Sequence, residues 1–295
     1  MDEIIEFQIS TNKRMNLLAK PEQSGFCFTS GVQRLIQLIR ENKLLEKDLK
    51  AVMAHAIDQV LSSFYDINQF YHFNDEAKYE LEQVYQQLLE EIKQESPVNF
   101  YKLAINHYKR LQNWLLQIHP EAERLFSKEE THIKQPVVCA EYSAATQLQT
   151  LSIKVESLKA PILDIGCGKD HHLVNYLRSK GLDAYGIDRD ANPSAYIYKS
   201  DWFDFDFYPG AWGTIISHLG FSNHFMHHHL KQNGLFEQYA RTYISILRAL
   251  KIGGSFYYAP GLPFIEPFLN KSEFTFICNP VPSTNLYAAH LTRMV

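Results

Sequence analysis

From Pro161 onward the chain alternates short β-rich runs with helical stretches, and this alternation constrains its fold most strongly. Because strands separated by helices run parallel, the pattern predicts a parallel sheet with helices on both faces, hence an α/β fold. The predicted strands are PILDI, AYGID, AYIYKS, GTIISHL, SFYYA, FTFIC and LYAAHLTRM. Only NPVPSTN joins the last two, which is too short for a parallel crossover. One of these two strands is therefore predicted to run antiparallel.

The preceding part of the chain has the apolar spacing of α-helices. Ser30 can cap a helix in which Val32, Leu35, Ile36 and Ile39 recur at helical spacing. The same periodicity continues through several further helices to about residue 158, the last of them over about 139–158. We therefore expect two domains, an all-helical domain over residues 1–158 and the α/β domain over residues 159–295.

A glycine turn follows the first predicted strand. The strand ends in Asp164, and Gly166 and Gly168 come before the next helix. Ligands of open parallel sheets bind beyond the carboxyl ends of the strands. Glycine lets the backbone turn tightly there and approach a ligand closely. The turn therefore predicts a ligand site at this edge of the sheet.

The next two predicted strands also end in acidic residues. The second strand ends in Asp188, whose carboxylate can accept hydrogen bonds from both hydroxyls of a ribose. The third is followed by Asp201 and Trp202, a carboxylate and an indole where an adenine ring could lie. The order of strand, turn, helix and two later acids predicts a site for an adenosine-containing ligand.

The charges around the turn indicate a cationic ligand. The fingerprint of dinucleotide-binding folds has glycine at its sixth position, which is His171 here, directly after Asp170. Asp164 and Asp170 would repel an anionic pyrophosphate, which disfavours a nicotinamide-dependent oxidoreductase. S-adenosylmethionine carries a ribose, an adenine and positive charge, and it matches the pattern.

The segment DIGCG, the acids after the next two strands and the run ALKIGGSFYY resemble the Rossmann-like (class I) methyltransferases that use S-adenosylmethionine. The resemblance covers about residues 160–295. It implies a seven-stranded sheet with a helix layer on each face and a reversed last strand pair. It also implies cofactor-binding roles for six residues, which are Asp164, Gly166 and Gly168 at the methionine end, Asp188 at the ribose, and Asp201 with Trp202 at the adenine. Lys169 and Asp170 stand where that family often has a third small residue.

The fourth predicted strand runs into a histidine-rich segment, SHLGFSNHFMHHHL. In the resembled fold the acceptor meets the methyl group here. Methyl transfer requires alignment of the acceptor and, for some acceptors, removal of a proton. Histidine titrates near neutral pH, so His218 is our first candidate for a catalytic base and His224 the second. Tyr142, on the helix expected before the first strand, is a candidate to close over the methionine end of the cofactor.

The same segment also allows a metal hypothesis. His224 and His228 are four residues apart and would share a helical face, to which His218 could add a third ligand. Three consecutive histidines point in different directions around a helix, however. We therefore expect no metal site, and keep metal-assisted methyl transfer, including transfer to carbon, as an alternative.

The sequence thus predicts an enzyme that moves a methyl group from S-adenosylmethionine to oxygen or nitrogen of a small organic acceptor, with the helical domain as a lid. The other alternative is a non-catalytic module that binds the nucleotide and presents its helical face to a partner protein. With 29 basic and 33 acidic residues, the chain lacks the basic excess typical of nucleic-acid binders. Four scattered cysteines and no apolar run of membrane-spanning length favour a cytoplasmic protein without a membrane partner.

Overall fold

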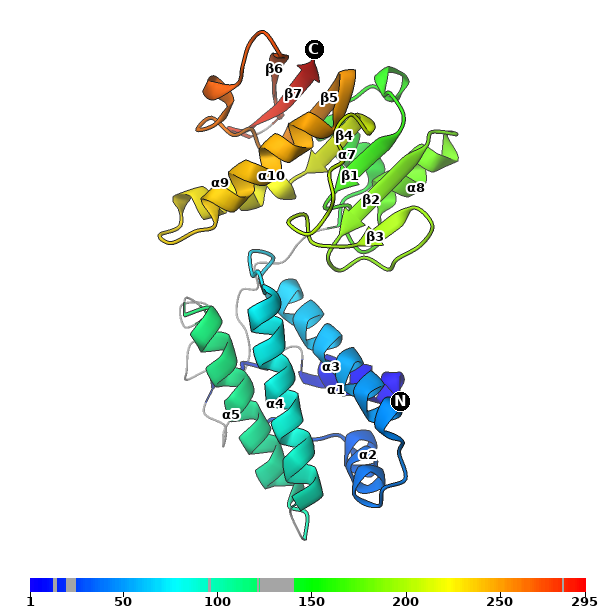
Figure 1. Ribbon diagram of the computed structural model, residues 1–295, viewed down its shortest axis with the longest axis vertical. Helices are drawn as coiled ribbons and strands as arrows, with labels where there is room; N and C mark the ends of the chain where they lie inside the picture. The colour runs from blue at the N-terminus through cyan, green and yellow to red at the C-terminus, as the bar shows by residue number, and fades with distance from the viewer. Residues whose placement is uncertain (13–14, 20–24, 95–96, 121, 123–140, 283) are drawn as a thin grey trace. The chain divides into compact units, whose positions relative to one another are not determined.

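The computed structural model describes residues 1–12, 15–19, 25–94, 97–120, 122, 141–282 and 284–295. The chain divides into two compact units, Met1–Cys139 and Ala140–Val295, which we describe separately (Figure 1). Among the described helices, none has the length and apolar character needed to span a membrane.

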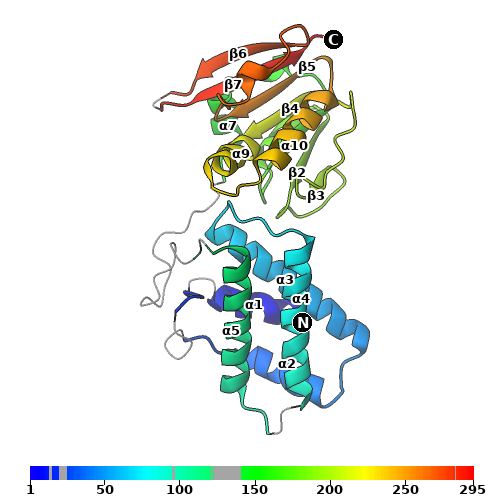
Figure 2. The ribbon, with the colours of Figure 1, turned by 60° about the vertical axis from the view of Figure 1, so that its left-hand side comes forward.

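The first unit is helical. Its described helices are α1 (Asp2–Asn12), α2 (Ser30–Arg40), α3 (Glu46–Ile67), α4 (Asp75–Gln94) and α5 (Phe100–Ile118). Asparagine caps start the last two, because the Asn74 side chain accepts a hydrogen bond from the Ala77 amide and the Asn99 side chain one from the Lys102 amide. Figures 1 and 2 both show α4 and α5 side by side.

An aromatic cluster forms much of the core of this unit. The Phe73 ring stacks on Trp114 with 5.1 Å between ring centroids, and Phe64 packs against both rings. The Trp114 indole donates a hydrogen bond of 2.9 Å to the Ala77 carbonyl, so its polar atom is satisfied inside the core.

The second unit contains a seven-stranded sheet in the order β3-β2-β1-β4-β5-β7-β6. The strands are β1 (Ile162–Ile165), β2 (Ala184–Asp188), β3 (Ile197–Lys199), β4 (Trp212–His218), β5 (Leu250–Ala259), β6 (Phe274–Pro280) and β7 (Tyr287–Arg293). The first five strands in sequence pair in parallel, whereas β7 is antiparallel to both of its neighbours. The predicted α/β fold with one reversed strand is confirmed.

Helices cover both faces of this sheet. Apolar side chains of α7 (Ala144–Thr150) and α8 (His172–Ser179) pack on the face that carries Ile162 and Ile216. Those of α9 (Phe221–Leu230) and α10 (Phe236–Ala249) pack on the face that carries Leu163 and Ile215. The predicted layer of helices on each face is present.

The helix expected over about 139–158 is much shorter than the sequence suggested. Of residues 141–158, which the structure describes, only α7 is α-helical, and a 3₁₀ turn over Val155–Ser157 follows it. Ser152 has a φ of 54°, a left-handed conformation that cannot continue the helix. Although assigned to the helical part from the sequence, α7 packs with the sheet of the second unit.

Candidate functional site

The carboxyl group of Asp164 lies buried in the middle of the sheet. Asp164 is 1% exposed, and neither of its carboxylate oxygens has a hydrogen-bond partner among the described residues. Burial raises the pKa of this carboxyl group to about 8, and the negative charges of Asp188 and Glu141 contribute to the rise. A buried carboxyl group without partners is costly, so this position is suited to a ligand that brings hydrogen-bond donors or positive charge.

The glycine turn after β1 is tied to the end of β2. The amides of Gly166 and Cys167 donate to the Ile187 carbonyl at 2.8 and 3.1 Å. The Gly168 amide donates to Asp188 Oδ2 at 3.1 Å. Gly166 and Gly168 have φ of 78° and 76°, a left-handed conformation that favours glycine. The turn therefore places the strand-end acids of β1 and β2 beside one backbone loop.

Asp164 and Asp188 share one face of the sheet. Asp164 is the register partner of Gly186, and side chains two residues apart on a strand point to the same face. The Asp188 oxygens accept from the amides of Gly168 and Asp190, and burial raises the pKa of Asp188 although these bonds lower it. Two carboxyl groups of raised pKa thus flank the turn.

Glu141 covers the turn from outside. Its Oε1 accepts a hydrogen bond of 2.8 Å from the Lys169 amide. A Cβ atom built on Gly168 would lie 2.6 Å from both Glu141 carboxylate oxygens, so no larger residue fits there without displacing Glu141. No sequence motif gives Glu141 a role, and its position beside Tyr142 before the first strand is its only signal in the sequence.

This close contact gives a first prediction. Gly168→Ala should weaken binding of the ligand of this turn by about tenfold or more, because the added Cβ meets Glu141 and the positive φ is strained. Gly181→Ala is the matched control, since Gly181 has a φ of 79° and a Cβ atom added there would have no neighbour within 4 Å. Binding titrations and thermal unfolding of both variants check this. Equal ligand binding by the two variants would contradict the role of the contact.

Asp201 and Trp202 lie in the loop after β3. Asp201 Oδ1 accepts a hydrogen bond of 3.0 Å from the Phe203 amide. The Trp202 indole packs edge to face on His224, with 5.0 Å between centroids, and a Cβ built on Gly166 would lie 3.5 Å from its ring. Trp202 is therefore next to the glycine turn.

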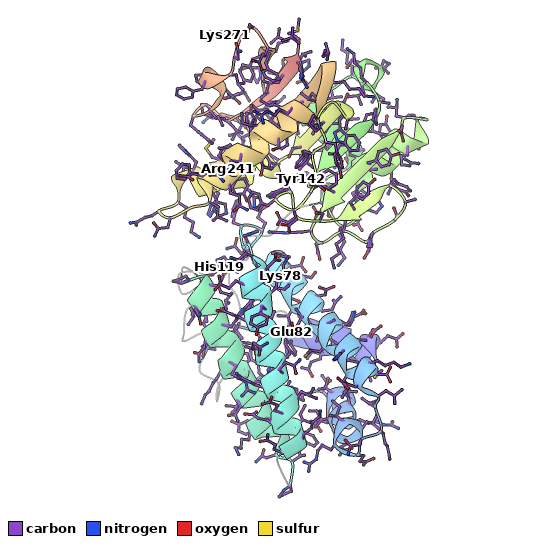
Figure 3. The ribbon with its side chains drawn as sticks, in the orientation of Figure 1. Lys78, Glu82, His119, Tyr142, Arg241 and Lys271 are labelled. Carbon is purple, nitrogen blue, oxygen red and sulfur yellow. The ribbon has the colours of Figure 1, made fainter. Side chains whose placement is uncertain are left out.

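His218 ends β4 on the same face of the sheet as Asp164, because Asp164 is the register partner of Ile216. It is 8% exposed, and its Nε2 has no hydrogen-bond partner among the described residues. Burial lowers the pKa of His218 to about 4, so the ring is neutral at neutral pH. Tyr142, in the segment before α7 rather than in a helix, packs against this ring with 4.9 Å between centroids (Figure 3).

The histidines of α9 serve in aromatic packing. His224 contacts Trp202, His228 stacks on Tyr239 and accepts from the Leu235 amide at 3.2 Å, and His229 stacks on Phe264. Within the described residues, ligand atoms of three metal-binding side chains come within 4.8 Å of one another only at Glu141, Asp170 and His172, all exposed. The histidine-ligated metal hypothesis gains no support from this geometry.

Strand order and pairing decide the fold of the second unit. Five parallel strands with β1 in the middle, an antiparallel β7 between β5 and β6, and a glycine turn after β1 match the resemblance found in the sequence. The second unit has the class I methyltransferase fold. Its glycine turn, strand-end acids and β4 tip lie at the carboxyl edge of the parallel strands, where ligands of such sheets bind.

Comparison with solved structures finds similar methyltransferases. An rRNA methylase from Streptococcus thermophilus has 13% identity, covering 54% of this chain and 100% of its own, with a TM-score of 0.35. The N-methyltransferase NodS from Bradyrhizobium japonicum has 16% identity, coverages of 51% and 94%, and a TM-score of 0.36. A methyltransferase from Bacteroides fragilis in complex with S-adenosylhomocysteine has 14% identity, coverages of 58% and 86%, and a TM-score of 0.35. No protein-family model and no curated protein sequence matches the chain.

Proposed function

We propose that this protein transfers a methyl group from S-adenosylmethionine to oxygen or nitrogen of a small organic acceptor. The observation that carries the proposal is the buried Asp164 carboxyl group, which has no partner among the described residues and lies beside the glycine turn of a class I methyltransferase fold. S-adenosylmethionine supplies an ammonium group and a sulfonium centre, the positive charges that such a carboxyl group lacks.

Each part of the donor has a matching group in this site. Asp164, Gly166 and Gly168 would hold the methionine end, and the remaining lone pairs of Asp188 would accept from the ribose hydroxyls. The Trp202 ring beside Gly166 would contact the adenine, with Asp201 on the same loop. The bound donor supplies an electrophilic methyl group, and the protein aligns an acceptor behind it.

His218 is our candidate for the group that accepts the acceptor's proton. Its Nε2 has no hydrogen-bond partner among the described residues and is unprotonated at neutral pH, so it can accept a proton, although a pKa of about 4 makes it a weaker base than an ordinary histidine. Tyr142 packs against the ring. His224 is the weaker candidate, because its ring packs against Trp202. Tyr142 would also lie next to the methionine end of the donor.

His218→Asn should lower the rate of methyl transfer by about 100-fold or more and change donor affinity by less than about threefold. His229→Asn, in the same segment but exposed, is the control and should retain full activity. The measurement is the rate of S-adenosylhomocysteine formation with a metabolite extract as the source of acceptor. A full rate in the His218 variant would remove His218 from the mechanism.

The helical unit is proposed to cover the acceptor and exclude water from the reaction. The composition of the helical unit supports this proposal, because the unit is rich in aromatic residues. It has no excess of basic residues, which favours a small organic acceptor over a nucleic acid. A shift in protease-cleavage rate within the helical unit on addition of S-adenosylhomocysteine and extract would test the closure; unchanged cleavage would contradict it.

A non-catalytic nucleotide-binding module is the second candidate, favoured by the low pKa of the first candidate base, since burial lowers the pKa of His218 to about 4 and makes it a weaker proton acceptor than an ordinary histidine. Incubation with labelled S-adenosylmethionine and metabolite extract separates the two. The enzyme hypothesis predicts extract-dependent transfer of label to a small molecule, and the binding hypothesis predicts donor binding without transfer.

A further inference from the structure

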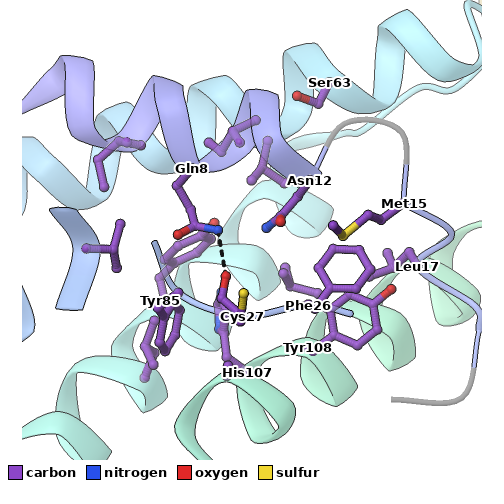
Figure 4. A pocket seen from close by; sticks show the side chains of 18 of the residues that line it. Gln8, Asn12, Met15, Leu17, Phe26, Cys27, Ser63, Tyr85, His107 and Tyr108 are labelled. Atoms are coloured by element: carbon purple, nitrogen blue, oxygen red, sulfur yellow. Dashed lines mark hydrogen bonds between the residues drawn. The ribbon is translucent and has the colours of Figure 1, made fainter. Parts of the chain in front are cut away.

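The helical unit contains a partly open, apolar cavity of about 180 Å³ (Figure 4). Side chains from α1, α2, α3, α4 and α5 and from the segments 15–17 and 26–28 line it. A cavity of about 150 Å³ in a protein core is large enough to bind benzene. This cavity therefore has room for a molecule slightly larger than one six-membered ring.

The lining favours an uncharged ring. None of the 20 lining residues that the structure describes is Asp, Glu, Lys or Arg, so these residues offer no ionic partner to a charged ligand. Phe26, Phe64, Tyr85 and Tyr108 contribute aromatic rings to the wall, and the remaining lining is mostly aliphatic. Rings of this kind pack well against a flat aromatic molecule.

Some of the polar groups in the wall are satisfied within the protein. Gln8 Nε2 donates to the Cys27 carbonyl at 3.0 Å, shown in Figure 4, and Gln8 Oε1 accepts from the Thr29 amide at 2.7 Å. The Tyr108 hydroxyl donates to the Asn16 carbonyl at 2.8 Å. These groups shape the wall and are not free to bind a ligand.

Two other polar atoms have no hydrogen-bond partner among the described residues, Asn12 Oδ1 and His107 Nδ1. His107 is 8% exposed, packs its ring edge against Tyr85, and is neutral because burial lowers its pKa to about 3. An unpartnered buried polar atom destabilises the folded protein. A ligand with a single donor group would remove part of this destabilisation.

We propose that this cavity binds a small, uncharged aromatic molecule that carries one N–H or O–H group, which donates a hydrogen bond to Asn12 or His107. Apolar area and ring stacking hold the ring, and the polar group sets its orientation. The site belongs to the helical unit alone, so the inference does not depend on the proposed methyl transfer.

Indole and 1-methylindole are matched probes for this site, since they share the ring and differ in the N–H donor. Equilibrium dialysis of the full chain should show one saturable indole site per chain, with binding of 1-methylindole weaker by at least about tenfold. Indole-3-acetate, which is anionic, should not bind there. Absence of saturable indole binding up to about 5 mM, or equal binding of the two indoles, would overturn the proposal.

Variants place the binding in the cavity. Ala104→Leu fills it and Asn12→Leu removes an acceptor, and each should weaken indole binding about tenfold or more. Ala51→Leu, an exposed change on α3, is the control and should bind indole normally, as should Asp164→Asn in the second unit. Circular dichroism shows which variants fold; if Ala104→Leu does not, Asn12→Leu decides. Normal indole binding by every folded cavity variant would refute the location.

Discussion

Asp164→Asn is expected to weaken S-adenosylmethionine binding by at least about 100-fold. Loss of one partner of a buried charge pair costs about 3–5 kcal/mol, and about 1.4 kcal/mol corresponds to each factor of ten in affinity. The asparagine side chain has nearly the same shape, so the change removes the charge and leaves the packing. S-adenosylhomocysteine has no sulfonium charge, and its binding should be weakened less.

The same substitution should stabilise the protein in the absence of donor. The pKa of Asp164 is raised from 3.8 to about 8 in the folded protein. Its contribution to the free energy of unfolding is therefore fully present below pH 4 and is lost as the pH rises through 8. Asparagine resembles the protonated form and carries no such loss. At pH 8 the variant should unfold several degrees above the original protein.

Titration calorimetry and thermal unfolding in the absence of donor measure both effects. Asp206→Asn, an exposed change in the same unit, is the control and should alter neither donor affinity nor unfolding temperature. An Asp164 variant that binds the donor normally would show that the carboxyl group does not face the cation. An unfolding temperature below that of the original protein would show that the group is not strained by its burial.

Donor affinity should rise about tenfold per pH unit from pH 6 to about 7.5 and level off near pH 8. The Asp164 carboxyl group, with a pKa of about 8, is mostly protonated below that value and must lose its proton before it can pair with a cation. His218 does not contribute, because its pKa of about 4 lies below this range. The Asp164→Asn variant should show a much shallower profile, to which Asp188 still contributes because burial raises its pKa as well. A flat profile in the original protein would contradict the assignment.

The parts of the site that strand order determines could be predicted from sequence. Asp164 and Asp188 end neighbouring strands, and parallel strands end at one edge of a sheet, so their proximity followed from alternation alone. The burial of Asp164 and its lack of a hydrogen-bond partner among the described residues did not follow from alternation, because both depend on which loop atoms reach the carboxyl group.

Contacts between distant or irregular segments were outside the reach of the sequence. Glu141 covers Gly168 from a non-helical segment with no repeating pattern. Helical periodicity in the first unit identified which faces are buried, as for Val32 and Ile36, but periodicity does not report how tightly facing side chains fill the space between helices. The cavity beside His107 was therefore found only in the structure.

The histidines after β4 illustrate the opposite case, a conspicuous pattern with an ordinary structural use. The number of histidines suggested metal ligands. In the structure, however, His228 stacks on Tyr239 and His229 stacks on Phe264. An imidazole ring is a flat, partly apolar group, and next to aromatic side chains it packs as one. Only His218 combines burial, a position at the strand tip and an unpartnered ring nitrogen among the described residues.

The pairing of Asp164 with a cationic donor is best tested by measuring how many protons S-adenosylmethionine displaces when it binds. Titration calorimetry at pH 6.5, repeated in buffers with different heats of ionisation, gives that number. Because Asp164 is protonated in the free protein at this pH, we expect saturable binding with release of about one proton per donor, and much less release by Asp164→Asn. No binding heat at millimolar donor, or binding without proton release, would contradict this pairing.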